Sequence, residues 1–309
     1  MQINLQFFWT ILGGFSIAFH IWLIFSGLIP NLVSRPLHMA LALPWCLMYG
    51  RSGNSFRIGT LLTGLGVLAC GYIILNQELL AEQYGYISSL WQGGIAILLL
   101  IIVLEMARSS IGWPLPVVAL IALCYGLYGQ YLPGEFGHPG LPLNSFLGTM
   151  TIAEGGIWGK LTGVSVNVVA IFVIFGAVLN AGEAGQGFMN LAMAAAGRLK
   201  AGVAKVSVLS SALFGSISGS ASANVASTGS FTLPAMIRQG YPRDFAAAVE
   251  AVASSGGQIM PPLMGAGAFV MVELTGIPYT EIMSAALLPA ILFFLTVWIG
   301  INAFASRMD

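Results

Sequence analysis

The sequence predicts an all-α polytopic membrane protein with about eight membrane spans and one re-entrant helical hairpin. Of its 309 residues, 57% are hydrophobic and only 7% are charged, whereas about 25% of residues are charged in ordinary soluble domains. The mean hydropathy is +0.89, and several apolar stretches approach the roughly 20 residues with which a helix crosses a bilayer. We therefore expect membrane lipids as partners. The formal net charge is zero, which gives no pointer to nucleic acid, and we expect none as a partner.

The predicted spans follow the apolar stretches in order. These stretches lie at 7–29, 37–50, 58–76, 89–107, 113–132, 164–181, 245–274 and 282–304. No basic residue precedes the first, so we interpret it as a retained span and not as a cleaved signal peptide. The second is short and contains Pro44, which predicts a tilted or kinked helix. Between the fifth and the sixth, a turn-rich segment predicts an external loop followed by a short interfacial helix.

Basic residues predict which ends of the spans face the cytoplasm, because cytoplasmic loops are enriched in lysine and arginine. A cytoplasmic N-terminus leaves only Arg35 and Lys160 in outside loops. The other nine of the eleven basic residues then lie inside, namely Arg51, Arg57, Arg108, Arg198, Lys200, Lys205, Arg238, Arg243 and Arg307. We therefore predict a cytoplasmic N-terminus.

The re-entrant hairpin is predicted at 206–237. No charged residue occurs between Lys205 and Arg238, yet the centre, 215–230, holds six serines and three glycines. A single helix of this length would extend about 48 Å, beyond a hydrocarbon core of about 30 Å. Basic residues flank both ends, so we expect both on the cytoplasmic side. We therefore predict two helical arms with the Ser/Gly run as a tip near mid-membrane, where broken elements of transporters bind ions and substrates.

The span at 245–274 is predicted to be broken in its middle. Gly256, Gly257, Pro261 and Pro262 interrupt its helical pattern, glycine through its backbone freedom and proline because it lacks an N–H donor. An unwound segment that faces the hairpin tip would build a cation site from carbonyl and hydroxyl oxygens without burying a formal protein charge.

The hairpin and the broken span resemble a known transporter family. The similarity is carried by ALFGSISGSASANVASTGSFTLPAMIRQGY and FAAAVEAVASSGGQIMPPLMGAGAFVM, which resemble the large membrane subunit of tripartite ATP-independent periplasmic (TRAP) transporters. It is greatest to the fused permeases that work with TAXI-type binding proteins. It also covers PLPVVALIALCYGLYGQYLPG and EGGIWGKLTGVSVNVVAIFVIFGAVLNAGEAG, and so extends over about residues 110–309.

The resemblance implies an elevator-type secondary transporter of the bacterial inner membrane, which imports a small organic anion such as a dicarboxylate or glutamate together with sodium. A separate periplasmic TAXI-type binding protein would deliver the substrate. Residues 1–110 would form a four-span, small-subunit-like scaffold module, and 111–309 the first repeat of the large-subunit-like transport module. The family's large subunit has two inverted repeats, and one is found here. The resemblance thus implies either a missing second half on another chain or a truncated fragment that does not transport.

The resemblance also implies site residues, position by position. Substrate would be bound by Ser218, Ser220 and Asn224. Sodium would be held by the tip and the unwound stretch, through Ser216, Gly219, Thr228, Gly229, Ser254, Ser255, Gly256 and Gly257. Pro261 and Pro262 would fix the break in the span.

Other interpretations of these residues remain open. Gly215 and Gly219 form a GxxxG pair, which is also typical of tight helix packing. Ser218 would suit an intramembrane serine hydrolase, but such a nucleophile needs a base within reach, and all three histidines precede the hairpin. A passive channel would show flux without saturation or sodium dependence.

Titratable side chains in or near the predicted spans are further candidates for a functional site. Glu250 and Glu273 lie in or near the broken span, where a carboxylate is a functional candidate by default, but we place both near the membrane interfaces. His20 lies in the first span, and we interpret it as a packed neutral side chain and not as a proton relay.

Overall fold

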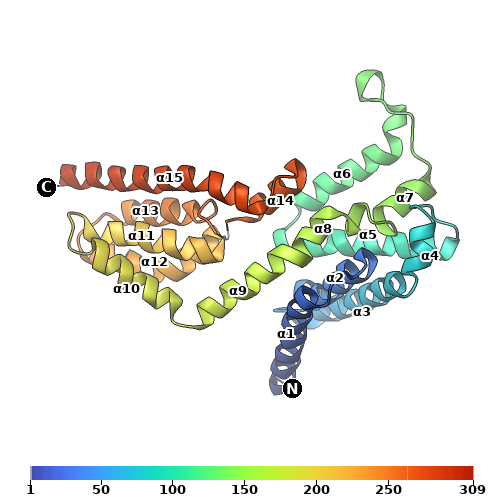
Figure 1. The fold of residues 1–309 in the computed structure, drawn as a ribbon, viewed down its shortest axis with the longest axis horizontal. Coiled ribbons are helices and arrows are strands. Elements are labelled where there is room, and N and C mark those ends of the chain that lie inside the picture. The colour runs from blue at the N-terminus through green and yellow to red at the C-terminus, as the bar shows by residue number, and fades with distance from the viewer. Residues whose placement is uncertain (1, 263, 309) are drawn as a thin grey trace. The chain divides into compact units, whose positions relative to one another are not determined.

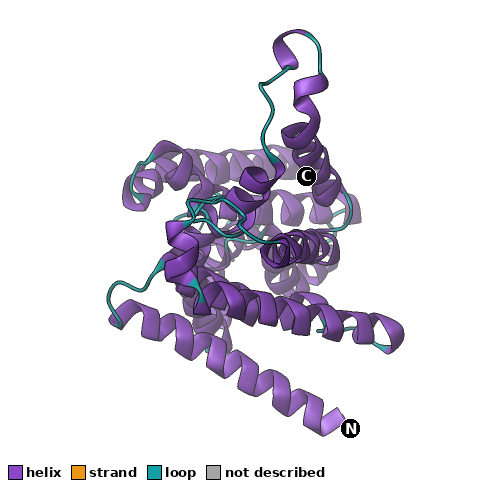
Figure 2. Cartoon of the chain, turned by 90° about the vertical axis from the view of Figure 1, so that its right-hand side faces the viewer, coloured by secondary structure: helices purple, strands orange, loops and turns teal. Residues whose placement is uncertain are grey.

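The computed structural model describes residues 2–262 and 264–308, and every regular element within them is a helix (Figure 2). Within these described ranges, six stretches are long and apolar enough to cross a membrane: Leu5–Phe25, Gly53–Leu75, Leu90–Ile111, Pro114–Tyr131, Leu143–Leu179 and Tyr279–Arg307. This is the polytopic, all-helical class that the sequence predicts. The chain forms two compact units, Met1–Asn167 and Val168–Asp309, which are described separately.

The first unit is built from long helices with shorter pieces between them. Its elements are α1 (Gln2–Phe25), α2 (Asn31–Leu47), α3 (Gly53–Leu75), α4 (Gln77–Glu82), α5 (Leu90–Ile111), α6 (Pro114–Tyr128), η1 (Gly129–Tyr131), η2 (Gly134–Phe136), α7 (Leu143–Thr151), η3 (Gly156–Trp158) and α8 (Lys160–Val164). Helices α2, α3 and α5 pack against one another, and their core includes the buried Ile73, Leu99 and Trp158. The predicted short helix after the external loop is α7, whose Phe146 and Leu147 join this core.

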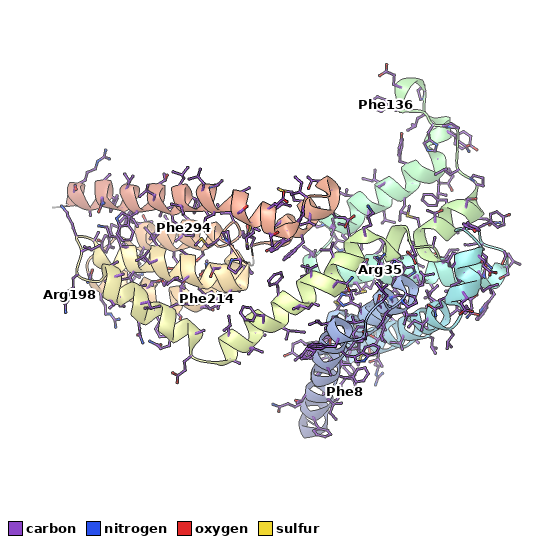
Figure 3. All side chains as sticks on the ribbon, viewed as in Figure 1. Phe8, Arg35, Phe136, Arg198, Phe214 and Phe294 are labelled. Atoms are coloured by element: carbon purple, nitrogen blue, oxygen red, sulfur yellow. The ribbon has the colours of Figure 1, made fainter. Side chains whose placement is uncertain are left out.

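Helix α2 begins earlier than the sequence predicts, at Asn31. Arg35, which the prediction assigns to an external loop, therefore lies inside the helix (Figure 3). Its Nη1 donates a hydrogen bond to the carbonyl oxygen of Trp158. Gly163 leaves room for the guanidinium, because a Cβ added there would lie 2.8 Å from Nη2 of Arg35. The guanidinium of Arg35 is thus hydrogen-bonded within the first unit, so α2 can include Arg35 and begin before it.

The second unit contains the predicted hairpin and the broken span. The π-helical segment η4 (Ser165–Val169) leads into it, and its elements are α9 (Ala170–Ala181), α10 (Ala184–Ala196), α11 (Gly202–Ser218), α12 (Ala221–Arg238), α13 (Arg243–Gly256), α14 (Ala266–Thr275) and α15 (Tyr279–Met308). Helices α11, α12 and α13 pack pairwise, α10 lies against α11, and α15 contacts α11 and α13 (Figure 1). The buried Met236, Ala253 and Phe294 belong to their common core.

The arms of the hairpin are longer than predicted and its tip is shorter. Helix α11 runs to Ser218 and α12 begins at Ala221, so most of the Ser/Gly run 215–230 is helical. Lys205 lies in the first turns of α11 and is buried, with its Nζ 5.0 Å from the centroid of the Trp298 ring. A cation over an aromatic face is favourable, which allows the helix to include the lysine.

The predicted break of the span 245–274 is confirmed. Helix α13 ends at Gly256 and α14 begins at Ala266, so neither piece alone is long enough to cross a bilayer. The sequence predicts that helix resumes at about Leu263, a residue that lies outside the described residues.

Candidate functional site

The hairpin tip consists of Gly219 and Ser220. Gly219 has a φ of 59°, the left-handed conformation that glycine commonly adopts after a helix. A Cβ added to it would lie 2.1 Å from the carbonyl oxygen of Met264, so a larger residue would displace the segment that joins α13 to α14. Oγ of Ser220 accepts a hydrogen bond from the N–H of Ala223 at 3.3 Å and caps α12. The tip therefore lies directly against the break.

The segment between α13 and α14 is tied to itself and to α15. The N–H of Gly265 donates to the carbonyl oxygen of Gln258 at 2.6 Å. The hydroxyl of Tyr279, at the start of α15, donates to the carbonyl oxygen of Pro262. Its ring stacks on that of Phe269, with 4.9 Å between centroids. The predicted break residues Pro261 and Pro262 lie in this segment, which presents backbone carbonyl groups next to the tip.

A cavity of about 310 Å³ lies beside the tip. Its walls are mainly apolar and include Phe172, Phe214 and Phe269, while Ser218 and Gly219 contribute polar atoms; Phe214 is labelled in Figure 3. Oγ of Ser218 is buried and has no hydrogen-bond partner among the described residues. Buried hydroxyl groups are nearly always hydrogen-bonded, so the unpartnered Oγ of Ser218, a residue that lines this cavity, makes Ser218 a candidate ligand.

Below the tip, α11 meets the end of α13 through two glycines and one asparagine. A Cβ added to Gly215 would lie 2.3 Å from the Cα of Gly257. The side-chain amide of Asn224, on α12, donates to the carbonyl oxygen of Ser211 at 2.8 Å and approaches that of Ser254 at 3.5 Å. Asn224 is fully buried. One amide thus connects all three helices.

One turn further from the break, a carboxylate lies among hydroxyl groups. Glu250, on α13, is 1% exposed. Its Oε2 lies 2.7 Å from Oγ of Ser207 and 2.5 Å from Oγ1 of Thr232. Its Oε1 lies 2.5 Å from Oγ1 of Thr228 and 3.2 Å from Oγ of Ser254. We call Glu250 and these four hydroxyl residues the carboxylate network.

Seven of the predicted site residues lie in one of two places in the structure. Ser218 and Gly219 lie at the tip cavity. Five others lie where the hairpin packs on α13, namely Asn224, Thr228, Gly229, Ser254 and Gly257. Gly229 is part of this contact because a Cβ added there would lie 3.1 Å from Cγ of Glu250.

The other four predicted ligands have different surroundings. Oγ of Ser216 donates to the carbonyl oxygen of Leu213 at 2.7 Å, and Ser220 caps α12. Ser255 is on the exposed face of α13, where its Oγ donates to the carbonyl oxygen of Ala251 at 2.8 Å. Gly256 packs on α15, since an added Cβ would lie 2.4 Å from the ring of Phe293. Their assignment as sodium or substrate ligands stays a prediction.

Comparison with known proteins decides the family. The family described as "Tripartite ATP-independent periplasmic transporter, DctM component" matches residues 98–309, more than half of the chain. The chain belongs to this family. The match begins within α5, near the module boundary that the sequence predicts at residue 110, and it includes the hairpin, the break and the carboxylate network.

Individual members of the DctM family match over shorter segments. The C4-dicarboxylate TRAP transporter large permease protein DctM of Rhodobacter capsulatus is 34% identical over 128 residues, which are 40% of this chain and 29% of the relative. The isethionate TRAP transporter permease protein DctMQ of Oleidesulfovibrio alaskensis is 37% identical over 94 residues, which are 30% of this chain and 15% of the relative. The ectoine/5-hydroxyectoine TRAP transporter large permease protein UehC of Ruegeria pomeroyi is 25% identical over 198 residues, 63% of this chain and 45% of the relative.

The chain therefore matches less than half the length of each of these relatives. No solved structure matches it.

Sequence reasoning missed the carboxylate network of this DctM-family chain. The sequence places Glu250 one or two turns from the cytoplasmic end of its span, and the position of Glu250 two turns after the start of α13 agrees with this. It does not predict that the carboxylate is buried among hydroxyl groups. A signal was available in the spacing: three polar pairs are four residues apart and so share one face of each helix. These pairs are Ser207 with Ser211 on α11, Thr228 with Thr232 on α12, and Glu250 with Ser254 on α13.

Proposed function

We propose that this chain carries one of two substrate-binding hairpins of a sodium-coupled TRAP permease, which imports a small organic anion across the bacterial inner membrane. The observation that carries the proposal is the two-residue tip, where Gly219 lies against the carbonyl of Met264 and the buried hydroxyl of Ser218 lacks a partner. In this proposal the hairpin is re-entrant, with both ends on the cytoplasmic side. Residues 1–110 then serve as the scaffold module.

The oxygens at the tip fit a sodium ion. Hard cations prefer oxygen ligands. We here assign to sodium the Oγ of Ser218, which the resemblance assigns to substrate, together with the carbonyl groups of Gly219 and of Met264, a residue that the sequence does not single out. Among the described residues no group of three or more His, Cys, Asp or Glu is placed to hold a metal ion, so this site would consist of neutral oxygens. Bound sodium would supply a positive charge next to the tip cavity.

An anionic substrate fits the other side of the same cavity. Helix α12 begins at Ala221, and Ala223 in its first turn lines the cavity. The N–H of Ala223 is bonded to Oγ of Ser220, but the dipole at the helix N-terminus still favours negative charge there. A cavity of about 310 Å³ is at the small end of ligand pockets. Two of the relatives are named for C4-dicarboxylate and isethionate, which are small organic anions, and we propose a carboxylate of this size.

Two partners complete the proposal. A periplasmic binding protein of the TAXI type would deliver the substrate, as the sequence resemblance implies. A second large-subunit half would contribute the opposing hairpin. The matched segments make up 29% and 45% of the length of two relatives, and the second half is part of the proposal.

The sodium site is tested on the chain alone with a thiol reporter at the tip. Ser220 is exposed, so Ser220→Cys in a variant without the native Cys46, Cys70 and Cys124 reports access to the tip. We expect sodium to slow labelling and potassium at equal ionic strength to have no effect. Adding Ser218→Ala should raise the sodium concentration for half-maximal protection about tenfold, the factor for one lost interaction of about 1.4 kcal/mol.

Our proposal leaves out Ser216, which the resemblance assigns to sodium, because its Oγ donates to a carbonyl oxygen of its own helix. Ser216→Ala is therefore the matched control. Its half-maximal sodium concentration should stay within about twofold of the parent. Equal protection by potassium, or an unchanged sodium dependence in Ser218→Ala, would remove the sodium site. Substrate flux without sodium dependence would favour the passive channel. No flux, either by the chain alone or with a second half supplied, would favour the non-transporting fragment.

The serine hydrolase alternative is weaker than transport. A serine nucleophile needs a base within hydrogen-bond reach, and Oγ of Ser218 has no hydrogen-bond partner among the described residues. Membership of the DctM family also favours a permease. Labelling of Ser218 by a serine-reactive probe, lost in Ser218→Ala, would revive the hydrolase.

A further inference from the structure

We propose that the groove between α13 and α15 binds one anionic phospholipid, with an acyl chain along the groove and the phosphate group at Arg307. This inference goes beyond the proposed transport function, since it requires neither sodium nor a second half. It depends on the open space in the groove, on the apolar character of its walls, on its length and on the charge at one end.

The α13–α15 groove is an open space between two packed helices of the second unit (Figure 1). It has a volume of about 650 Å³, and α13 contributes Phe245, Val249 and Val252 to it from one face of the helix. Helix α15 forms the opposite wall, on which Gly300 lies midway. Nothing lies within 4 Å of a Cβ added to Gly300. The groove therefore has room for a ligand beside this residue.

The walls of the groove are apolar along most of its length. Among the described residues that line it, the polar side chains are those of Thr296 and Arg307. Oγ1 of Thr296 donates to the carbonyl oxygen of Leu292 at 2.7 Å, so its single proton is used within its own helix. A polar molecule would lose its hydrogen bonds to water in such a groove, whereas a hydrocarbon chain has none to lose. The interior therefore suits an acyl chain.

The length of the groove matches one leaflet of a bilayer. Phe293 and Phe304 both line it and lie eleven positions apart on α15, which corresponds to about 16 Å of helix. Half of a hydrocarbon core of about 30 Å is about 15 Å, the depth that the acyl chains of one leaflet fill. Since α15 is itself long and apolar enough to cross a membrane, one acyl chain can extend beside it from Phe304 to Phe293.

Arginine side chains lie at one end of the groove. Arg307 lines the groove about one turn beyond Phe304. The rings of Phe245 and Phe304 stack with 3.6 Å between their centroids, so the start of α13, with Arg243, lies at the same end. Arg238 ends α12, the helix that precedes α13. An acyl chain in the groove would therefore place its head group among arginines.

The charge at this end favours an anionic head group over a zwitterionic one. The described charged side chains at the end of α12, the start of α13 and the end of α15 are three arginines and Asp244, all of them exposed. Guanidinium groups bind phosphate through two parallel hydrogen bonds. Basic pockets between membrane helices on the cytoplasmic side bind anionic lipid head groups, and the sequence places all three arginines on that side. We therefore commit to an anionic phospholipid as the occupant.

Native mass spectrometry of the purified chain in a non-ionic detergent tests the binding. The probes are phosphatidylglycerol and phosphatidylcholine with identical acyl chains, because the choline cation offsets the phosphate charge. We expect one retained phosphatidylglycerol, with a half-saturating concentration about tenfold below that of phosphatidylcholine, the factor for one charge-assisted contact. Equal retention of the two lipids would overturn the proposal. A dimer without retained lipid would assign the groove to a second copy of the chain and would also overturn it.

The head-group contact is tested by Arg307→Gln, which removes the charge and leaves the apolar walls in place. Its affinity for phosphatidylglycerol should fall about tenfold, to the value for phosphatidylcholine. Arg198→Gln is the matched control, because Arg198 is an exposed arginine of the same unit, in the turn between α10 and α11 (Figure 3). Its affinity should stay within about twofold of the parent. Equal losses in the two variants would show attraction to positive charge in general and would overturn the site.

The acyl-chain contact is tested by Gly300→Leu, which fills the middle of the groove. Both lipids should bind at least about tenfold more weakly, because the side chain takes the place of the acyl chain. The variant should fold, since its Cβ enters open space and leucine favours helix over glycine, and its unfolding midpoint without lipid verifies this. Gly64→Leu on α3 is the control, because its added Cβ also has nothing within 4 Å. Parent-like lipid binding by Gly300→Leu would overturn the proposal.

The position of the chain is tested with a phosphatidylglycerol that carries a photoreactive diazirine near the end of one acyl chain. Crosslinked peptides should map to 245–252 and 293–304, and crosslinks confined to other segments would overturn the site. The same lipid added to membranes of the producing cells distinguishes a protein occupant. Crosslinks to these segments that form with the purified chain and are absent in those membranes would assign the groove to a partner helix and would overturn the proposal.

Discussion

Gly215 on α11 lies directly against Gly257 at the end of α13, because a Cβ added to Gly215 would lie 2.3 Å from the Cα of Gly257. The Cβ positions of both residues also face the side-chain amide of Asn224. Small residues allow membrane helices to pack this closely. The sequence leaves two interpretations of the GxxxG pair, helix packing and ligand binding. In the structure Gly215 packs against α13, while Gly219 forms the tip.

Gly215→Ala should lower the thermal unfolding midpoint of the protein in detergent. The added methyl group overpacks the contact, and overpacking costs about 1–3 kcal/mol of folding free energy. Gly300→Ala on α15 is the matched control, because nothing lies within 4 Å of its added Cβ, and alanine favours helix over glycine by about 0.5–1 kcal/mol. A midpoint for Gly215→Ala equal to or above that of Gly300→Ala would contradict the assignment.

Asn224→Asp should destabilise the hairpin more than its small change of shape suggests. The substitution replaces the amide donor with an acceptor that faces the carbonyl oxygens of Ser211 and Ser254, and each unsatisfied buried group costs about 1–3 kcal/mol. Hydrogen exchange of backbone amides in α11 and α12 should become faster. Asn302→Asp, at a partly exposed position of α15, should leave that exchange unchanged. Parent-like protection of the hairpin in Asn224→Asp would show that the amide does not connect the three helices.

The three histidines have tautomers that the structure determines. Nδ1 of His20 lies 2.7 Å from the carbonyl oxygen of Ser16, which can only accept, so Nδ1 carries the proton. Nε2 of a neutral His20 then accepts from Nδ1 of His38, 2.7 Å away, and Nε2 of His38 accepts from Oγ of Ser165 at 3.1 Å. His138 has the opposite tautomer, with the proton on Nε2, since its Nε2 donates to the carbonyl oxygen of Tyr125 at 3.0 Å.

Nitrogen-15 NMR of histidine-labelled protein should therefore show two Nδ1–H tautomers and one Nε2–H tautomer. His138→Gln should remove the Nε2–H signal alone. His20→Phe frees Nδ1 of His38 from its acceptor and should let His38 populate both tautomers. An Nε2–H signal that disappears in His20→Phe and not in His138→Gln would contradict the hydrogen-bond directions.

Gly163→Ala should weaken the contact between α8 and α2, because the new Cβ would lie 2.8 Å from Nη2 of Arg35. We expect a loss of about 1–3 kcal/mol of folding free energy. Arg35→Ala removes the side chain that meets the new methyl group, so the double variant should lose less than the sum of the single variants. Additive losses would mean that Arg35 and Gly163 do not interact.

The hairpin and the break can be predicted from the sequence because their signals lie within short stretches of the chain. A charge-free interval with basic flanks and a Gly/Pro interruption are visible without the fold. The length of the tip cannot be predicted in this way. Serine side chains weaken isolated helices, but they can also donate hydrogen bonds to carbonyl oxygens of the same helix. Here Oγ of Ser210, Ser216 and Ser230 donates to carbonyl oxygens three or four residues earlier, so the helices continue through the Ser/Gly run.

The direction in which each predicted ligand faces depends on the assembled helices. Gly256 and Gly257 are neighbours in sequence, yet one packs on Phe293 of α15 and the other on Gly215 of α11. Successive helical residues are rotated by about 100°, and no local pattern states which neighbour each will meet. Glu250 is a similar case, since its four hydroxyl partners come from three different helices.

The carboxylate network has a mechanical consequence. Side-chain hydrogen bonds join α11, α12 and α13 through Ser207, Thr228 and Glu250, and lipid tails offer no replacement for them. Separating the hairpin from α13 within a bilayer would expose each of these groups to hydrocarbon. The network therefore couples the hairpin to α13, so a force applied to either one is transmitted to the other through these side chains.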